Sequence, residues 1–356
     1  MNNNLSESAG NQKNGISAAN SFNALRFFFC VIVVAGHYLD LSRLEFAHRK
    51  LLDMHISVCA FFILSGYWVT KSYLKNRNVR MLYKKRFLRI FPLYFLSVFG
   101  FAYLLVFFSD LSASEYFSSR GFWKYLFWNA LTLNFIAPSL PGVFAQNTFS
   151  AVNGALWTIK VEVGFYLILP ALVFFLDRLS GVKKKNIFLA AIYIISVLWS
   201  ALLKRYASTL GLPGQLSWQL PGFMSFFASG MAFVYNEDAL AKIERFMIFP
   251  ALIIFAAHYI TGTEILMPFA LSAIIMFLGN RLRFLSEIGQ PADYSYGMYL
   301  FHFPLINIFV SLGFPERSPV FSLLIITATT LAMAFIAEKY IQRKINRLAG
   351  RWQKNP

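Results

Sequence analysis

The stretch FNALRFFFCVIVVAGHYLDL, residues Phe22 to Leu41, decides the fold class of this chain. It is 20 residues long, which is the length of apolar helix that crosses the hydrocarbon core of a bilayer. Arg26 and His37 lie inside it, with ten residues between them along the chain. On a helix they share one face, about 16 Å apart along the axis. Ionisable groups inside a membrane helix are costly and usually functional, so this stripe predicts a site.

The rest of the chain has the same apolar character. Of its 356 residues, 57% are hydrophobic, 14% are charged and 40 are Phe. Apolar runs near 20 residues recur along its length, which predicts an all-α fold, a polytopic transmembrane helix bundle. Both cysteines, Cys30 and Cys59, fall in predicted spans, so neither a disulfide framework nor a Cys-based metal site is expected.

The distribution of basic residues predicts the topology. Eleven spans are candidates, and the one near 122–140 is doubtful because it contains Lys124 and two Asn and ends at a Pro138/Pro141 pair. If it does not cross, the cytoplasmic segments hold 23 Lys and Arg and the outer loops hold 8, as the positive-inside rule favours. We predict about ten crossings with the N- and C-termini cytoplasmic, and a re-entrant or interfacial segment near 122–150. The ten spans lie near 22–41, 51–70, 87–108, 154–176, 186–203, 217–235, 246–260, 264–279, 294–312 and 319–337.

Three regions follow along the chain. Residues 1–20 are rich in Asn and Ser and lack a signal pattern, so we expect a disordered cytoplasmic tail. Residues 21–340 form the transmembrane domain, and 341–356 form a basic cytoplasmic tail suited to anionic membrane lipids. The net charge of +17 is concentrated in loops, which indicates topology and gives no reason to expect a nucleic-acid partner.

Arg86 and Arg89 lie at the start of the third span, three residues apart and therefore on one helix face. Guanidinium forks suit phosphate oxygens, and the nearby Pro92 and aromatic residues favour a shaped site. A positive-inside anchor with snorkelling side chains explains the spacing about as well. Lys84 and Lys85 fit that anchor role better.

Glu162 lies inside the span 154–176 at a depth similar to that of His37. A buried carboxylate needs a cation or a donor, so we expect it to pair with His37 and raise the basicity of the imidazole. A structural ion pair with Lys160 or Arg26 is the alternative. Lys160 is only two residues away, and so it should point to a different face.

Ser295, Tyr299 and His302 recur at i, i+4 and i+7, so they form one polar stripe that should face a cavity or another polar helix. A packing role for His302 is the alternative. Ser65 and Gly66 allow close approach, either of a neighbouring helix or of a ligand. His37 and His302 have no further ligand at a suitable spacing, so no metal is expected.

The chain resembles the acyltransferase family three of integral-membrane acyltransferases, over roughly residues 20–340. Each motif is modest alone, but their order and spacing are specific. The motifs are Arg26-x10-His37; Phe61-Phe62-x-Leu64-Ser65-Gly66-Tyr67; Arg86-x-x-Arg89 with Ile90-Phe91-Pro92-Leu93-Tyr94; Leu156-Trp157-x-x-x-Val161-Glu162-x-x-Phe165-Tyr166-Leu167; and Ser295-Tyr296-x-x-Tyr299-Leu300-x-His302-x-Pro304.

The resemblance implies transfer of an acyl group, often acetyl, from cytoplasmic acyl-CoA to a hydroxyl of a surface polysaccharide or a lipid-linked sugar. It also implies a multi-pass protein of the bacterial cytoplasmic (inner) membrane. In this reading the catalytic residues are His37, Glu162 and His302, with His37 as general base or transient acyl carrier. Acyl-CoA would bind Arg26, Arg86 and Arg89, and the acceptor would meet Ser65, Trp157, Ser295 and Tyr299.

Two departures from the family pattern and two other function classes stay open. Val163 stands where the family often has a second acidic residue, and Lys160 stands where a small residue is common. A secondary transporter could use His37, Glu162 and Arg26 as a relay, although no inverted repeat is evident. A non-catalytic membrane scaffold would leave three separate polar helices unexplained.

Overall fold

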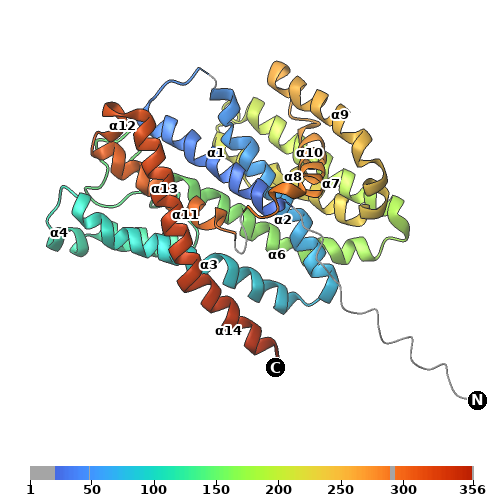
Figure 1. Ribbon diagram of the computed structural model, residues 1–356, viewed down its shortest axis with the longest axis horizontal. Coiled ribbons are helices and arrows are strands. Elements are labelled where there is room, and N and C mark those ends of the chain that lie inside the picture. Colours follow the sequence, from blue (N-terminus) through green and yellow to red (C-terminus); the bar gives the residue numbers. More distant parts are fainter. Residues whose placement is uncertain (1–20, 48, 289–292, 355–356) are drawn as a thin grey trace, which may run out of the picture.

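The computed structural model describes residues 21–47, 49–288 and 293–354, and helices carry the structure (Figure 1). Within these residues no strand forms, and one isolated bridge joins Ser109 to Val143. The all-α prediction is therefore confirmed. The predicted disordered tail, 1–20, lies outside the described residues.

A helix lies at each of the ten predicted spans. By length and composition, five segments could cross a membrane: Phe22–Ser42, Val79–Phe108, Gly154–Asp177, Gly181–Tyr206 and Pro319–Leu348. The larger number of crossings stays a prediction. The ten helices are α1 (Phe22–Ser42), α2 (Met54–Asn76), α3 (Val79–Leu104), α6 (Trp157–Asp177), α7 (Gly181–Tyr206), α8 (Leu220–Tyr235), α9 (Glu237–Thr261), α10 (Met267–Arg281), α11 (Ser295–Ser311) and α13 (Pro319–Ala337).

The shorter helices connect these elements. A π-helical turn at Glu338–Gln342 leads from α13 into α14, which projects from the body of the bundle (Figure 1). The short α-helices are α4 (Ala113–Ser118), α5 (Arg120–Ala130), α12 (Phe314–Arg317) and α14 (Arg343–Lys354).

The segment 122–150 does not form a spanning helix. α5 ends at Ala130 after 11 residues, about 16 Å of helix against the roughly 30 Å of a bilayer core. The chain then folds back without helix. The Asn129 side-chain amide donates to the Ala137 carbonyl at 2.9 Å, and the Val152 amide donates to the Pro138 carbonyl at 2.9 Å.

Close packing of α2 against α8 explains the glycine of the Ser65-Gly66 pair. A Cβ atom at Gly66 would collide with the Phe227 carbonyl oxygen, and one at Gly230 would collide with the Ile63 carbonyl oxygen. Small residues at such crossings let two helix backbones approach in a membrane. Gly66 is thus a packing notch, whereas the neighbouring Ser65 faces a cavity.

Pro304 shapes α11 beside His302. It has no N–H, so the Leu300 carbonyl, one turn earlier, lacks its usual helical donor. The Ser97 hydroxyl donates to this oxygen at 3.0 Å, and the Asn153 side-chain amide donates at 2.9 Å. The Leu300 carbonyl, which Pro304 leaves without a helical donor, is therefore bonded to α3 and to the loop before α6.

Pro92 does the same in α3. It removes the helical donor of the Leu88 carbonyl, to which the fully buried Gln342 side chain donates at 2.7 Å. The π-helical turn is thereby fastened to α3 between Arg86 and Arg89.

Candidate active site

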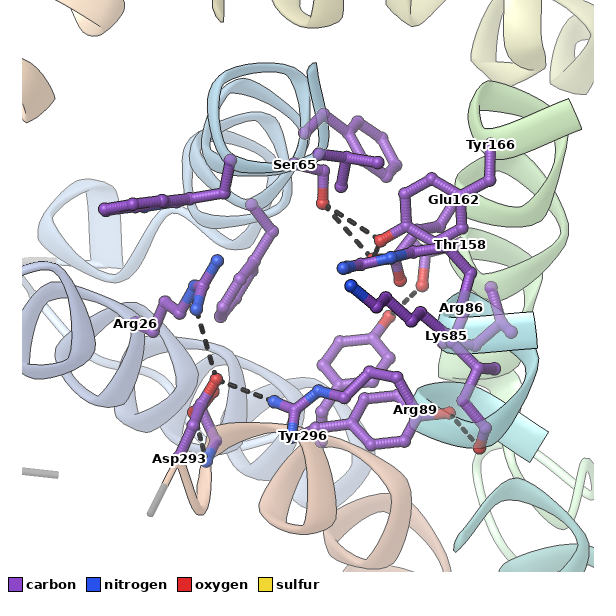
Figure 2. A pocket seen from close by; sticks show the side chains of 18 of the residues that line it. Arg26, Ser65, Lys85, Arg86, Arg89, Thr158, Glu162, Tyr166, Asp293 and Tyr296 are labelled. Atoms are coloured by element: carbon purple, nitrogen blue, oxygen red, sulfur yellow. Dashed lines mark hydrogen bonds and ion pairs between the residues drawn. The ribbon is translucent and has the colours of Figure 1, made fainter. Parts of the chain in front are cut away.

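Helices α1, α2, α3, α6 and α11 surround a cavity of about 460 Å³ (Figure 2). Asn346 of α14 also contributes to its lining. Six charged side chains line it: Arg26, Lys85, Arg86, Arg89, Glu162 and Asp293. Four are cations and two are carboxylates, so the cavity is suited to an anionic ligand.

Asp293 joins two of the predicted arginines. One carboxylate oxygen, Oδ2, lies 3.4 Å from Nη1 of Arg26 and 2.8 Å from Nη2 of Arg89 (Figure 2). The other, Oδ1, accepts from the Ser295 backbone amide at 3.1 Å and from the Ser295 hydroxyl. Burial acts to raise the pKa of Asp293, but the Arg89 and Arg26 guanidinium groups hold it below its usual value.

This arrangement groups Arg26 with the arginines of α3, and Asp293 is the partner that sequence reasoning missed. An acidic residue directly before the polar stripe of the last motif was the available signal. Its contact with α1 and α3, more than 200 positions away, has no local signature in the sequence.

Arg86 points into the cavity from α3 (Figure 2). Its guanidinium carbon lies 5.5 Å from the centre of the Tyr166 ring, within the range of a cation–π contact. Among the described residues its buried Nε atom has no hydrogen-bond partner. The guanidinium carbon of Arg89 lies 5.9 Å from the centre of the Tyr296 ring. Both arginines line the cavity, so they share one side of α3 as predicted.

Glu162 has other partners than the one expected. Its Oε1 accepts from the Ser65 hydroxyl at 3.2 Å and from the Tyr166 hydroxyl (Figure 2). The expected contact with His37 is replaced by these two. The sequence places Glu162 and His37 at a similar depth along their helices. Depth does not determine the direction in which a side chain points around the helix axis. Lys160 does point to a different face, with its ammonium 4.6 Å from the centre of the Phe135 ring.

His37 pairs with His302 instead. Nδ1 of His37 lies 3.0 Å from Nε2 of His302, and the latter side chain is fully buried. Nδ1 of His302 lies 2.8 Å from the Tyr299 carbonyl and 3.2 Å from the Met298 carbonyl. Because a carbonyl oxygen only accepts, Nδ1 of His302 must carry a hydrogen.

The same reasoning fixes the protonation of His37. A neutral His302 has its lone pair on Nε2, which must accept from Nδ1–H of His37. The lone pair of His37 then lies on Nε2, on the side of the ring away from His302. These hydrogen positions are inferred from the contacts, and they leave Nε2 of His37 with a lone pair that can accept a proton.

The stripe on α11 faces the bundle interior as predicted. Ser295 and Tyr299 line the cavity, and the ring centres of Tyr299 and His302 are 5.7 Å apart. The Tyr299 hydroxyl donates to the Ala155 carbonyl at 2.7 Å and lies 2.6 Å from the Thr158 hydroxyl. The histidine pair therefore lies next to the cavity, behind Tyr299.

Trp157, the first residue of α6, packs against aromatic residues of α8 and of the short segment before it. Its ring centre is 6.3 Å from that of Trp218 and 5.8 Å from that of Phe223. Its predicted contact with an acceptor stays a prediction. Across residues 21–47, 49–288 and 293–354 no group of three or more His, Cys, Asp or Glu could hold a metal ion.

A cation-rich cavity inside the helix bundle thus lies beside a pair of histidines. Among protein families, the one described as an acyltransferase domain matches residues 19–339. The chain belongs to this family, acyltransferase family three, and it is an integral membrane acyltransferase. The resemblance seen in the sequence motifs is thus confirmed.

Three relatives cover most of the chain. An O-acetyl transferase of Shigella phage Sf6 is 23% identical over 93% of this chain and 98% of its own length. Nodulation protein 10 of Rhizobium leguminosarum bv. viciae is 24% identical, over 83% of this chain and 84% of its own. The peptidoglycan O-acetyltransferase OatA of Listeria monocytogenes is 23% identical over 92% of this chain and 56% of its own. No solved structure matches the chain.

Proposed function

We propose that the protein moves an acetyl group from cytoplasmic acetyl-CoA to a hydroxyl of a carbohydrate, either a cell-surface polysaccharide or a lipid-linked sugar. Family membership establishes acyl transfer, and two relatives are named O-acetyl transferases. One observation carries the choice of donor: cations line the cavity, and the His37–His302 pair lies behind Tyr299. An anionic carrier fits these cations, and its thioester would extend toward the histidines.

The proposed topology has ten crossings, with both termini on the cytoplasmic side of a bacterial inner membrane. Contacts between helix ends support it, because they sort those ends into two sets. One set contains Arg77–Asp177, Lys71–Glu237 and Arg281–Glu244, and the other contains Lys204–Glu264 and Tyr38–Pro319. The first set lies at the end of α1 that carries Arg26, because the Ser21 amide there donates to the Gly279 carbonyl, two residues before Arg281. The charge asymmetry assigns that end to the cytoplasm.

The chemistry follows from the lone pair on Nε2 of His37. This atom takes the proton of the acceptor hydroxyl as its oxygen attacks the thioester carbonyl. The new C–O bond forms, the C–S bond breaks, and the proton passes to the departing CoA thiolate. His302 holds the reactive tautomer of His37, as its contact geometry requires.

Glu162 and Ser65 would position substrate inside the cavity. Both line it from facing helices, α6 and α2, and they already share a hydrogen bond. Ser295 and Tyr299 complete the polar lining near the histidines. A transient acyl group on His37 uses the same lone pair and is the second form of the mechanism.

The experiment is acyl transfer by the purified protein in lipid nanodiscs. Radiolabelled acetyl-CoA and a carbohydrate acceptor are supplied, and release of CoA and labelling of the acceptor are measured. His37→Ala should abolish both while the protein keeps its unfolding temperature. Transfer retained in this variant would sink the assignment. Label accumulating on His37 when acceptor is withheld would select the acyl-carrier form, and labelled substrate crossing sealed vesicles unchanged would favour a transporter.

A further inference from the structure

The four cations of the cavity do not have equal freedom to bind a ligand. Arg26 and Arg89 share one oxygen of Asp293, at 3.4 Å and 2.8 Å. The second oxygen of Asp293 is occupied by Ser295. This carboxylate, whose side chain is 13% exposed, therefore ties α1, α3 and the start of α11 into one ion-paired cluster.

Arg86 lies one turn earlier on α3 and differs from this pair. Its Nε is buried, and within the described residues no hydrogen bond reaches that atom. A buried donor without a partner costs free energy. Because this atom is closed off from the cavity, a ligand would meet the outer nitrogens of the guanidinium group. Its guanidinium group is held over the Tyr166 ring and so is aimed before any ligand binds. Lys85 points into the same part of the cavity (Figure 2).

The family resemblance already implies that Arg86 binds acyl-CoA. We infer that Asp293 holds Arg26 and Arg89 as a positioning bridge, which leaves Arg86 and Lys85 to receive a phosphate of the acyl donor. This inference rests on the proposed donor and divides its binding among the four cations. Asp293 also sets the charge of the cavity. The four cations and two carboxylates give the cavity a net positive charge, which attracts an anion. The two carboxylates reduce this attraction, so that CoA can dissociate after transfer.

The test is CoA binding to the purified protein in nanodiscs, measured by calorimetry. Arg86→Gln should weaken binding about ten- to a hundredfold, the effect of losing a charged hydrogen bond. The double variant Arg89→Gln/Asp293→Asn removes an ion pair while leaving Arg86, and its affinity should stay within about threefold of wild type. Arg80→Gln is the matched control, since Arg80 is exposed on the same helix.

Asp293 needs a readout that a purely structural role would leave unchanged. Asp293→Asn releases two guanidinium groups into the cavity, so CoA affinity should fall more steeply with added salt than in wild type. Asp293→Glu should restore the wild-type salt dependence. Asp177→Asn, which breaks the Arg77–Asp177 pair outside the cavity, should leave it unchanged.

Two failures are distinguishable. A wild-type protein that does not bind CoA would overturn the proposed donor, and this inference with it. A wild-type protein that binds CoA, but loses equal affinity in Arg86→Gln and in Arg89→Gln/Asp293→Asn, would overturn the division of roles alone. An Asp293→Asn variant with wild-type salt dependence would likewise refute the positioning role of Asp293.

Discussion

Nε2 of His302 lies 3.0 Å from Nδ1 of His37, so an imidazole on α11 orients the imidazole on α1 that we propose as the base. The chain of contacts begins at the Tyr299 carbonyl, which fixes a hydrogen on Nδ1 of His302. Each step selects the tautomer of the next ring. Two histidines from distant motifs are thus in direct contact, and the contact with His302 leaves the lone pair of His37 on its second nitrogen.

His302→Leu tests this orientation. It removes the His302 acceptor for Nδ1–H of His37 and leaves only the backbone hydrogen bond with Val33 to hold that ring, so the reactive tautomer is fixed less firmly. We expect kcat for acyl transfer to fall about a hundredfold or more, within the range for general-base catalysis, while CoA affinity stays unchanged. His302→Gln can present a carbonyl oxygen to His37 and should retain more activity than Leu. Equal loss in both variants would contradict the tautomer argument.

Glu162→Gln tests the cavity carboxylate. It preserves shape but removes the charge that accepts from Ser65 and Tyr166. Charged hydrogen bonds are about twice as strong as neutral ones, so transfer should fall about tenfold or more. The control is Glu237→Gln, because Glu237 also accepts from a tyrosine, Tyr67 at 3.1 Å, outside the cavity. A similar loss in that control would make the effect one of stability, which thermal unfolding would reveal.

The sequence predicted the components of the site better than their pairing. Periodicity placed Ser295, Tyr299 and His302 on one face, and the structure turns that face inward. Helix depth also grouped Arg26 with Arg89. The pairing of Glu162 failed because depth along one helix says nothing about rotation around the bundle axis. Asp293 was missed because a bridge between three helices is a tertiary contact without a local pattern.

Gly66→Ala tests the packing of α2 against α8. The new Cβ would collide with the Phe227 carbonyl oxygen, and backbone cannot swing aside as a flexible side chain can. We expect a loss of about 1–3 kcal/mol in the free energy of unfolding, typical of overpacking, seen as a lower unfolding temperature in nanodiscs. Gly100→Ala, where the added methyl meets open space on α3, should be neutral or slightly stabilising. An unchanged Gly66→Ala would contradict the close crossing.

Gln342→Leu tests the hydrogen bond that joins the π-helical turn to α3. A second change, at Pro92, separates this bond from the packing of the side chain. Gln342 donates to the Leu88 carbonyl at 2.7 Å because Pro92 cannot. Its loss leaves a buried carbonyl unsatisfied and should cost about 1–3 kcal/mol in the free energy of unfolding. Pro92→Ala returns an N–H to that position, so the same Gln342→Leu change should cost markedly less in the Pro92→Ala background. Additive costs in this double-mutant cycle would show that Gln342 acts through packing alone.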